Sequence, residues 1–484
     1  MAEKVVDINM KGASVTVTGP LPVTGDSFPF NSSGRQQVPV DLAAYGYTEE
    51  EFIVSGAANV YRWYDSGASP ATVRTSGSPY TTRILVRRPE RTGKFSGNVI
   101  VEPFNWAQGY DKPWGAWGES WSYFLARGDA WVGVTIRPSS VVALQHFDPL
   151  RYAPLSFKNP LPLDQTCADP GCYPTPSYPS SEDGLSYDII SHIGALMKSN
   201  APAGPLAGYQ VAYVCAAGAT GGDLSAYVSA IHPLAKLDNG KPVYDGYIIK
   251  CTGSPGCINQ CEPKLSPDDP RCKLYADVPV IRILTQGDIL GEGFHPDWSF
   301  LQRRPDGDAP GEQFRLYEVA GSYVEGRYAP CSFPCREDII ASGIDWQETY
   351  WQPGEVPAYE FPLNYIMNGA FANLDRWLRE GTPPPRAERL ATIGGYPEVK
   401  FELDDLGNVR GGVRTPYVDV PIAVYESFGK VTPLEKEVLE KLYPTHEDYV
   451  GKVVENTDKL LRERWITATD AEAIKEQARN APVP

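Results

Sequence analysis

One short segment of the chain has the pattern of a nucleophile elbow. Residues 211–224, VAYVCAAGATGGDL, place an apolar strand before a turn of small residues and the start of a helix. Such a turn normally has the sequence G-x-S-x-G, because the strained, closely packed backbone tolerates only small residues while the serine hydroxyl is held above the sheet. Here residues 218–222 are GATGG, so Thr220 is the candidate nucleophile. The alternative is that its hydroxyl caps the helix that follows.

Four other side chains are candidates for chemistry. Cys215 lies inside the strand, and we expect a buried, inert thiol there rather than a nucleophile. Asp223 starts the helix, where a carboxylate either complements the positive helix N-terminus or serves as an acid or base. Asp288 follows another apolar strand and is either a functional carboxylate or a structural hydrogen-bond acceptor. His295 is close enough in sequence to fold over the same site.

The elements that must position these groups alternate between strands and helices. β-branched and aromatic runs predict strands at residues 80–89, 97–104, 130–137, 210–216, 244–250, 278–285 and 313–319. Helices are predicted at 118–127, 184–199, 223–231, 362–380 and within 433–479. Several strands are apolar on both faces, which is typical of a sheet covered by helices. We predict an α/β fold with a mostly parallel sheet, preceded by antiparallel strands near 15–18 and 51–63.

Nine cysteines and three long irregular segments indicate loops held by disulfides. The segments cover about 138–183, 251–277 and 325–360 and contain eight of the cysteines. We interpret them as cap insertions in a single domain that ends in a helical appendage at about 430–484. Up to four disulfides are expected among them, with Cys215 left as a thiol. A zinc site is less favoured, because neither C-x-x-C nor H-x-x-x-H spacing is present.

Composition and charge exclude several classes of function. The 484 residues are 42% hydrophobic and 21% charged, as in a folded protein. With 60 acidic and 44 basic residues, the net charge of −16 would repel nucleic acid. No apolar run approaches the ~20 residues of a membrane span, and the first residues lack the apolar stretch of a signal peptide. We expect no nucleic-acid partner, no membrane span, no cofactor and no metal, and the cysteines favour a secreted protein or another oxidising compartment.

Six segments make the chain resemble the large α/β-hydrolase-domain proteins of bacteria and fungi. They are YTEEEF at 47–52, YTTRILV at 80–86, VEPFN at 101–105, EVAG at 318–321, WLREGTPP at 377–384 and GNVRGGVRTP at 407–416. The resemblance extends from the N-terminal strands nearly to the C-terminus and implies an α/β-hydrolase fold. In such proteins the elbow is usually G-x-S-Q-S-G-x-x-L, and a histidine lies in an A-G-x-x-H segment after a later strand.

The same resemblance implies that two members of a Ser-His-Asp triad are replaced. Gly218 occupies the serine position and Val324 the histidine position, while Asp288 occupies the acid position. Without serine such a site has no nucleophile, and without histidine it has no proton carrier. Glu325, next to the histidine position, is either a replacement base or a solvated surface carboxylate.

The loop after the strand at 97–104 is expected to form one wall of the site. In α/β-hydrolases this loop and the residue after the nucleophile donate the backbone N–H groups of the oxyanion hole. The tryptophans at 114, 117 and 121 have helical spacing, so they either face a core or line an aromatic pocket. The residues expected to contact a ligand are Asn105, Trp106, Tyr110, Trp114, Gly218, Ala219, Tyr323 and Val324.

Three classes of function remain open, and fold alone does not choose among them. The first is a lyase, isomerase or cyclase that acts on a hydrophobic, carbonyl-bearing small molecule through carboxylates such as Asp288, Asp223 and Glu325, without a covalent intermediate. The second is an ester or lactone hydrolase that uses a displaced nucleophile such as Thr220. The third is a catalytically silent binding protein. If the backbone donors are still available, Gly218→Ser with Val324→His should create weak esterase activity.

Overall fold

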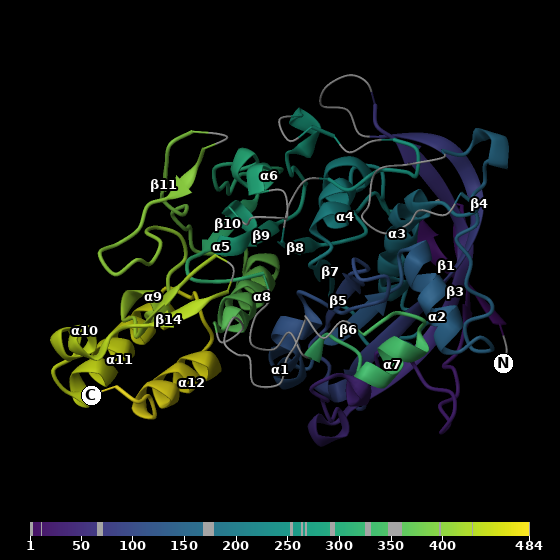
Figure 1. Ribbon diagram of the computed structural model, residues 1–484. Coiled ribbons are helices and arrows are strands. Elements are labelled where there is room, and N and C mark those ends of the chain that lie inside the picture. The colour runs from purple at the N-terminus through teal and green to yellow at the C-terminus, as the bar shows by residue number, and fades with distance from the viewer. Residues whose placement is uncertain are drawn as a thin grey trace. The chain divides into compact units, whose positions relative to one another are not determined.

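The computed structural model describes all residues except 1–2, 11, 65–70, 168–178, 252–254, 263–264, 267–268, 291–295, 325–330, 347–360, 396–397, 428 and 484 (Figure 1). The chain divides into two compact units. Unit 1 comprises Met1–Val278 and Pro330–Glu348, and unit 2 comprises Pro279–Ala329 and Thr349–Pro484.

Unit 1 is built on a sheet whose antiparallel part comes first in the sequence. The order of its strands is β1 (Glu3–Met10), β2 (Ala13–Thr18), β3 (Tyr47–Arg62), β4 (Thr72–Pro89), β6 (Ala130–Val134), β5 (Asn98–Pro103), β7 (Tyr213–Gly218) and β8 (Gly246–Lys250). Pairing is antiparallel from β1 through β4 to β6. From β6 through β5 and β7 to β8 it is parallel.

The parallel strands form because they can be buried on both faces. Every residue of β5, β6 and β8 is buried, which requires apolar side chains at consecutive positions rather than at alternate ones. α3 (Ser186–Lys198) packs against β1, β3, β5 and β7, α1 (Trp117–Arg127) against β6, and α4 (Gly221–Ala226) against β7 and β8 (Figure 1). A π-helical turn, Tyr227–Ile231, extends α4, and α2 (Pro138–Phe147) contacts α7 (Arg336–Ala341).

The predicted α/β fold and the antiparallel N-terminal strands are confirmed. The strand predicted at 80–89 is longer than expected, and it runs antiparallel to both of its neighbours. The reason is that β3 and β4 pair along almost their whole lengths, from Tyr47 opposite Pro89 to Arg62 opposite Thr72. The segment at 138–183 also begins with a regular helix, α2, rather than with loop.

Unit 2 contains a parallel strand pair, β9 (Val280–Thr285) and β10 (Phe314–Val319), in which every residue is buried. The helices that follow these strands in sequence are α5 (Gln286–Leu290), α6 (Pro296–Leu301) and α8 (Leu363–Glu380). Two short antiparallel pairs complete this part of the unit: β11 (Thr392–Ile393) with β12 (Lys400–Phe401), and β13 (Ala423–Tyr425) with β14 (Val431–Pro433).

Helices occupy the charged C-terminal segment, as predicted. They are α10 (Lys436–Leu442), α11 (His446–Arg462) and α12 (Ala468–Arg479), and α11 packs against α12. A short helix, α9 (Pro416–Asp419), precedes the predicted segment and contacts α11. Reciprocal capping boxes start the last two helices, at Thr445 with Asp448 and at Thr467 with Asp470. In the part of the chain that the structure describes, no helix has the length and apolar character needed to cross a bilayer. The single-domain organisation with cap insertions stays a prediction.

The cysteines confirm the disulfide prediction only in part. A disulfide joins Cys167 to Cys261 and so links two of the irregular segments, and Cys257 is also disulfide-bonded. Cys331 and Cys335 are thiols, so the expectation that these two take part in disulfides is wrong. Cys331 is buried in the interior, while Cys335 precedes α7 beside Arg35. Cys172 lies outside the described residues.

Candidate functional site

Buried charged side chains gather at the carboxyl ends of the four parallel strands of unit 1. They are Glu102 in β5, Arg137 after β6, Asp223 after β7 and Lys250 at the end of β8, and each is at most 2% exposed. Ligands of open α/β sheets bind at this edge. We call these four residues, together with the elbow at 218–222, the strand-end site.

Glu102 lies at the centre of the strand-end site. Its Oε1 accepts a hydrogen bond from the Ala116 amide at 2.9 Å, and its Oε2 accepts from the Trp117 amide at 2.9 Å and from Trp131 Nε1 at 2.7 Å. Burial raises the pKa of this carboxyl to about 7, although these bonds and Arg87 act in the opposite direction. Both protonation states are therefore populated near neutral pH, as a general acid or base requires.

Gly218 lies directly against Glu102. A Cβ atom at position 218 would come within 3.2 Å of Glu102 Cγ, which is tighter than an ordinary contact. Gly218 also has a φ of +152°, a backbone conformation that residues with a side chain rarely adopt. The turn is therefore shaped for glycine, and its serine position offers no side-chain oxygen.

A strap, residues 112–117 (KPWGAW), covers the elbow from the side. The Ala219 amide donates to the Trp114 carbonyl oxygen at 2.7 Å, and the Asn105 amide donates to the Lys112 carbonyl oxygen at 2.9 Å. Gly115 approaches so closely that a Cβ atom there would lie 2.6 Å from the Ala219 nitrogen. The two backbone N–H groups expected to bind an oxyanion are thus engaged by the protein, and the condition for restoring esterase activity with serine and histidine is not met.

Thr220 does not cap the helix, so that interpretation is wrong. It is the N-cap residue of α4, yet its side chain makes no capping hydrogen bond. Its Oγ1 is buried and has no hydrogen-bond partner among the described residues, and the whole residue is 5% exposed. A buried hydroxyl without a partner is uncommon, because desolvation of the group is then uncompensated.

Asp223 forms a buried ion pair with Arg137 and also accepts a hydrogen bond from Trp106. One carboxylate oxygen meets Arg137 Nη2, and the other accepts from Trp106 Nε1 at 2.8 Å. Arg137 Nη1 also donates to the Asp183 carbonyl oxygen at 2.9 Å, and its guanidinium lies 5.2 Å from the centre of the Trp106 ring. These contacts fix the direction of Trp106, one of the predicted ligand contacts.

Lys250 and the strap also meet in this region. Lys250 Nζ is 2.7 Å from Glu119 Oε1, and both side chains are fully buried. Two ammonium groups lie near the Trp114 ring, with Lys112 Nζ 4.3 Å and Lys250 Nζ 5.1 Å from its centre. Because α1 begins at Trp117, Trp114 precedes the helix, and the idea of one helical stripe at 114, 117 and 121 is wrong. Trp117 packs against Trp131 instead, with ring centres 5.3 Å apart.

The remaining predicted contacts of unit 1 lie around the same loop. Asn105 Nδ2 donates to the Ala219 carbonyl oxygen at 3.2 Å and so ties the β5 loop to the elbow. Tyr110 is buried and packs edge to face against Phe30, with ring centres 6.2 Å apart. Tyr110 is thus part of the interior beneath the loop.

The acid and histidine positions belong to unit 2. Asp288 Oδ2 accepts from both the amide and the hydroxyl of Thr285 at 2.8 Å, which closes the turn between β9 and α5. The Tyr323 ring lies beside Gly287, and both Tyr323 and Val324 are half-buried. Glu325 and His295 lie outside the described residues.

Sequence reasoning assigned no chemical role to Glu102 or Arg137: Glu102 was named within a strand and the segment 101–105, and Arg137 within a strand. For Glu102 a signal was available, since a single acidic residue interrupts the otherwise apolar strand NVIVEP. No local pattern marks Arg137, whose partner Asp223 is 86 positions away. Among the described residues no cluster of three or more histidine, cysteine, aspartate or glutamate side chains could hold a metal ion.

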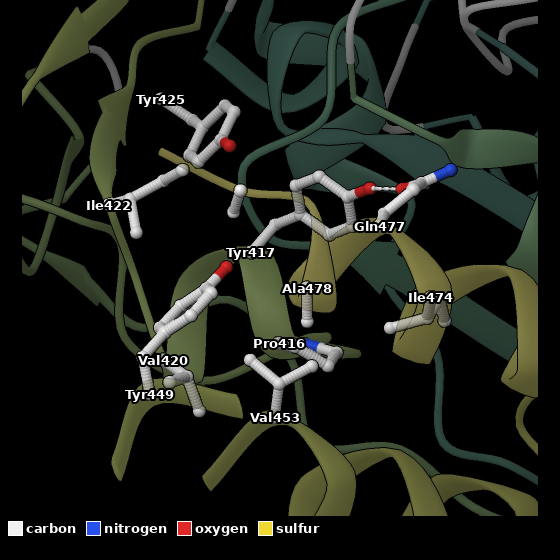
Figure 2. Close-up of a pocket in the computed structure, with 11 residues that line it drawn as sticks. Pro416, Tyr417, Val420, Ile422, Tyr425, Tyr449, Val453, Ile474, Gln477 and Ala478 are labelled. Carbon is white, nitrogen blue, oxygen red and sulfur yellow. Dashed lines mark hydrogen bonds between the residues drawn. The ribbon is translucent and has the colours of Figure 1, made fainter. Parts of the chain in front are cut away.

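Unit 2 also contains a small apolar pocket of about 100 Å³ among α9, α11, α12 and β13 (Figure 2). Tyr417 donates a hydrogen bond to Gln477 Oε1 at its edge, and Gln477 Nε2 donates to Tyr365 at 3.0 Å. Its lining contains no aspartate, glutamate, histidine or lysine, and none of the predicted site residues: Pro416, Tyr417, Val420, Ile422, Tyr425, Tyr449, Val453, Ile474, Gln477, Ala478 and Ala481.

A nucleophile-elbow turn at the end of a central parallel strand, facing a loop from the neighbouring strand, defines an α/β-hydrolase type of protein. The family model described as an alpha/beta hydrolase domain matches residues 17–476, and the chain belongs to that family. Among the curated proteins there is no significant match.

Solved esterase structures are similar to the chain at a low level. The esterase Est22 is 14% identical, covering 63% of this chain and 82% of its own, with a TM-score of 0.29. One of two fungal esterases from Rhizomucor miehei is 12% identical, covering 71% and 92%, with a TM-score of 0.30. A glucuronoyl esterase from Solibacter usitatus is 13% identical, covering 56% and 76%, with a TM-score of 0.25. Similarity of this degree carries no argument about the reaction.

Proposed function

We propose that the chain is an enzyme that binds a hydrophobic, carbonyl-bearing small molecule at the strand-end site and converts it by acid–base chemistry without a covalent intermediate. The observation that carries this proposal is the contact between Gly218 and Glu102. Where a serine hydrolase presents a hydroxyl, this chain presents no side chain, and a carboxyl group lies immediately beneath.

Glu102 is the proposed proton carrier. Its pKa of about 7, raised by burial, lets it take a proton from the carbon next to a carbonyl group and return it to another atom of the same molecule. The electron pair of the broken C–H bond passes into the enolate. In an isomerisation the pair is recovered when the proton is returned to another carbon. In an elimination the pair forms the C=C bond and the leaving group departs with the proton, and in a cyclisation the enolate carbon bonds to a second carbonyl carbon, whose oxygen takes the proton.

Other groups of the strand-end site are proposed to hold the molecule rather than to exchange protons with it. Trp106, fixed by Asp223 and Arg137, offers an aromatic surface to an apolar ligand. The unpartnered hydroxyl of Thr220 offers a hydrogen bond. We assign Asp223 to positioning, because its carboxylate is already paired with Arg137.

A hydrolase that uses Thr220 is the second candidate. This candidate is favoured by the buried Thr220 hydroxyl, which lies at the elbow and has no hydrogen-bond partner among the described residues. The hydroxyl, however, has no described imidazole to remove its proton. This favours acid–base chemistry at Glu102.

The test uses two probes on the full chain. Exchange of the α-hydrogens of 2-tetralone in D₂O, followed by NMR, reports proton transfer, and turnover of p-nitrophenyl butyrate reports hydrolysis. We expect the wild type to accelerate exchange, Glu102→Gln to lose about 100-fold or more of that rate, and Thr220→Val to keep most of it. Ester turnover that survives in Glu102→Gln and disappears in Thr220→Val would establish the hydrolase instead.

A further inference from the structure

We propose that the strap, residues 112–117, is an autoinhibitory segment whose Trp114 carbonyl oxygen occupies the place of the ligand's carbonyl oxygen. This inference rests on the proposed function, because it concerns the opening of the same site. A ligand then gains access only by displacing the strap from the elbow.

The first observation is the bond between the Ala219 amide and the Trp114 carbonyl oxygen, at 2.7 Å. In an elbow, the amide after the nucleophile position points to where a substrate oxygen gains negative charge. A peptide carbonyl is chemically the same kind of acceptor as the carbonyl of a ligand. The strap thus makes, within the chain, the contact that a ligand would make.

The second observation is that the strap also covers the proposed proton carrier. The amides of Ala116 and Trp117 both donate to the Glu102 carboxylate. They are N–H groups at the start of α1, which lack partners within the helix, and the N-cap residue, Ala116, has no polar side chain to bond them, so Glu102 takes that role. One movement of the strap would therefore expose Glu102 and release the Ala219 amide together.

The third observation concerns how the strap is seated. Gly115 has a φ of +107° and approaches the Ala219 nitrogen so closely that a Cβ atom would lie at 2.6 Å. Lys112 Nζ and Lys250 Nζ both lie near the Trp114 ring, 4.3 and 5.1 Å from its centre, but its Nε1 has no hydrogen-bond partner among the described residues. Thr220 Oγ1, one position after Ala219, likewise has none. The closed arrangement leaves polar groups that a ligand could satisfy.

The experiment measures hydrogen–deuterium exchange of the full chain at pH 7 by mass spectrometry. Gly115→Ala should push the strap away from Ala219 and accelerate exchange in peptides covering 112–117 and 218–220 by about fivefold, the effect of a net hydrogen bond of ~1 kcal/mol. Gly109→Ala is the matched control. It has the same kind of backbone in the same loop, with a φ of +85°, but its Cβ would meet Ile344 and not the elbow.

Addition of cyclohexanone to the wild type tests displacement. We expect exchange to rise in 112–117 and to fall at 218–220, because the ketone oxygen replaces the Trp114 oxygen on Ala219. If both segments become more protected, the strap is a lid that closes over the ligand, and the proposal is wrong. Unchanged exchange in Gly115→Ala overturns it as well.

Two further outcomes separate this inference from the proposed function. If Gly115→Ala does not fold, Trp114→Ala removes the ring that seats the strap and should produce the same acceleration. A second outcome is that exchange of the strap rises in either variant, while cyclohexanone changes the exchange rate of neither segment in any form of the chain. The chain then does not bind the ketone, but the closed position of the strap on the elbow is supported. Loss of 2-tetralone exchange in Glu102→Gln is independent of both results.

Discussion

The α-carbon of Gly218 lies against the side chain of Glu102, so that a methyl group at position 218 would come within 3.2 Å of Glu102 Cγ. The buried carboxyl group of Glu102 therefore lies in the space that a side chain at position 218 would need. This relationship explains why serine cannot simply be placed in the elbow, and it leads to the first two predictions.

Gly218→Ala should lower the free energy of unfolding by about 2 to 4 kcal/mol, since it adds both backbone strain and overpacking against Glu102. Gly208→Ala is the control, because Gly208 also has a positive φ, +85°, but nothing lies within 4 Å of its Cβ position. The control should lose only ~1 to 2 kcal/mol. Urea unfolding measures both, and equal losses would show that the contact with Glu102 is unimportant.

Gly218→Ser combined with Val324→His should show neither turnover of nitrophenyl esters nor an adduct with an organophosphate. The Ala219 amide is bonded to Trp114, so a tetrahedral intermediate would lack one of its backbone donors. Intact-mass measurement and a stopped-flow burst assay check this. An organophosphate adduct on the folded double variant would show that the strap opens by itself.

The pKa of Glu102 predicts how stability depends on pH. Because burial raises it from 4.5 to about 7, the folded state holds a proton that the unfolded state has lost between these values. The contribution of Glu102 to stability is therefore greatest below pH 4.5 and falls as pH rises toward 7, by up to ~1.4 kcal/mol per pH unit. The difference in urea stability between wild type and Glu102→Gln, measured from pH 5 to 8, should show this slope. A flat difference would mean that Glu102 is ionised throughout.

Arg137→Met should destabilise the fold by about 3 to 5 kcal/mol, because it leaves the Asp223 carboxylate buried without its counter-ion. Adding Asp223→Leu should recover part of the loss. Lys430→Met is the control, since its ion pair with Glu426 is exposed and should contribute at most ~1 kcal/mol. Thermal and urea unfolding measure the series, and strictly additive losses would contradict direct coupling of Arg137 and Asp223.

The disulfide between Cys167 and Cys261 spans 94 positions of sequence. Cys167→Ser should therefore lower the free energy of unfolding by about 2 to 5 kcal/mol, mainly because the unfolded chain gains conformational entropy. Cys335→Ser removes a thiol and should change little. Peptide mapping without reduction should find Cys167 joined to Cys261 and Cys331 as a thiol, which alkylates slowly because burial raises its pKa to about 11. A disulfide at Cys331 would restore the expectation that this cysteine takes part in a disulfide.

Filling the pocket of unit 2 should stabilise the chain. Ala478→Leu adds apolar atoms where α12 borders the pocket, and we expect a gain of ~1 kcal/mol in the free energy of unfolding. Ala468→Leu, exposed at the start of the same helix, is the control for helix propensity. A loss of stability in Ala478→Leu alone would mean that the pocket walls leave no room for the larger side chain.

The sequence by itself determined the elements and the place of the elbow. The predicted helix at 362–380 is α8 (Leu363–Glu380), and the predicted strand at 278–285 contains β9 (Val280–Thr285). The turn at 218–222 follows β7 as expected. Such features depend on periodicity and on turn residues that are close together in the chain, so they can be recognised locally.

Only the tertiary structure decided which polar groups meet. Glu102 finds its donors in the strap and in Trp131, and Asp223 finds Arg137, because the sheet order is β6, β5, β7, β8 rather than the order of the sequence. The occupied Ala219 amide depends on the path of a loop with no regular pattern. Buried charges and carbonyls must take partners from whatever packs beside them, and in this chain those partners come from segments that the sequence places far apart.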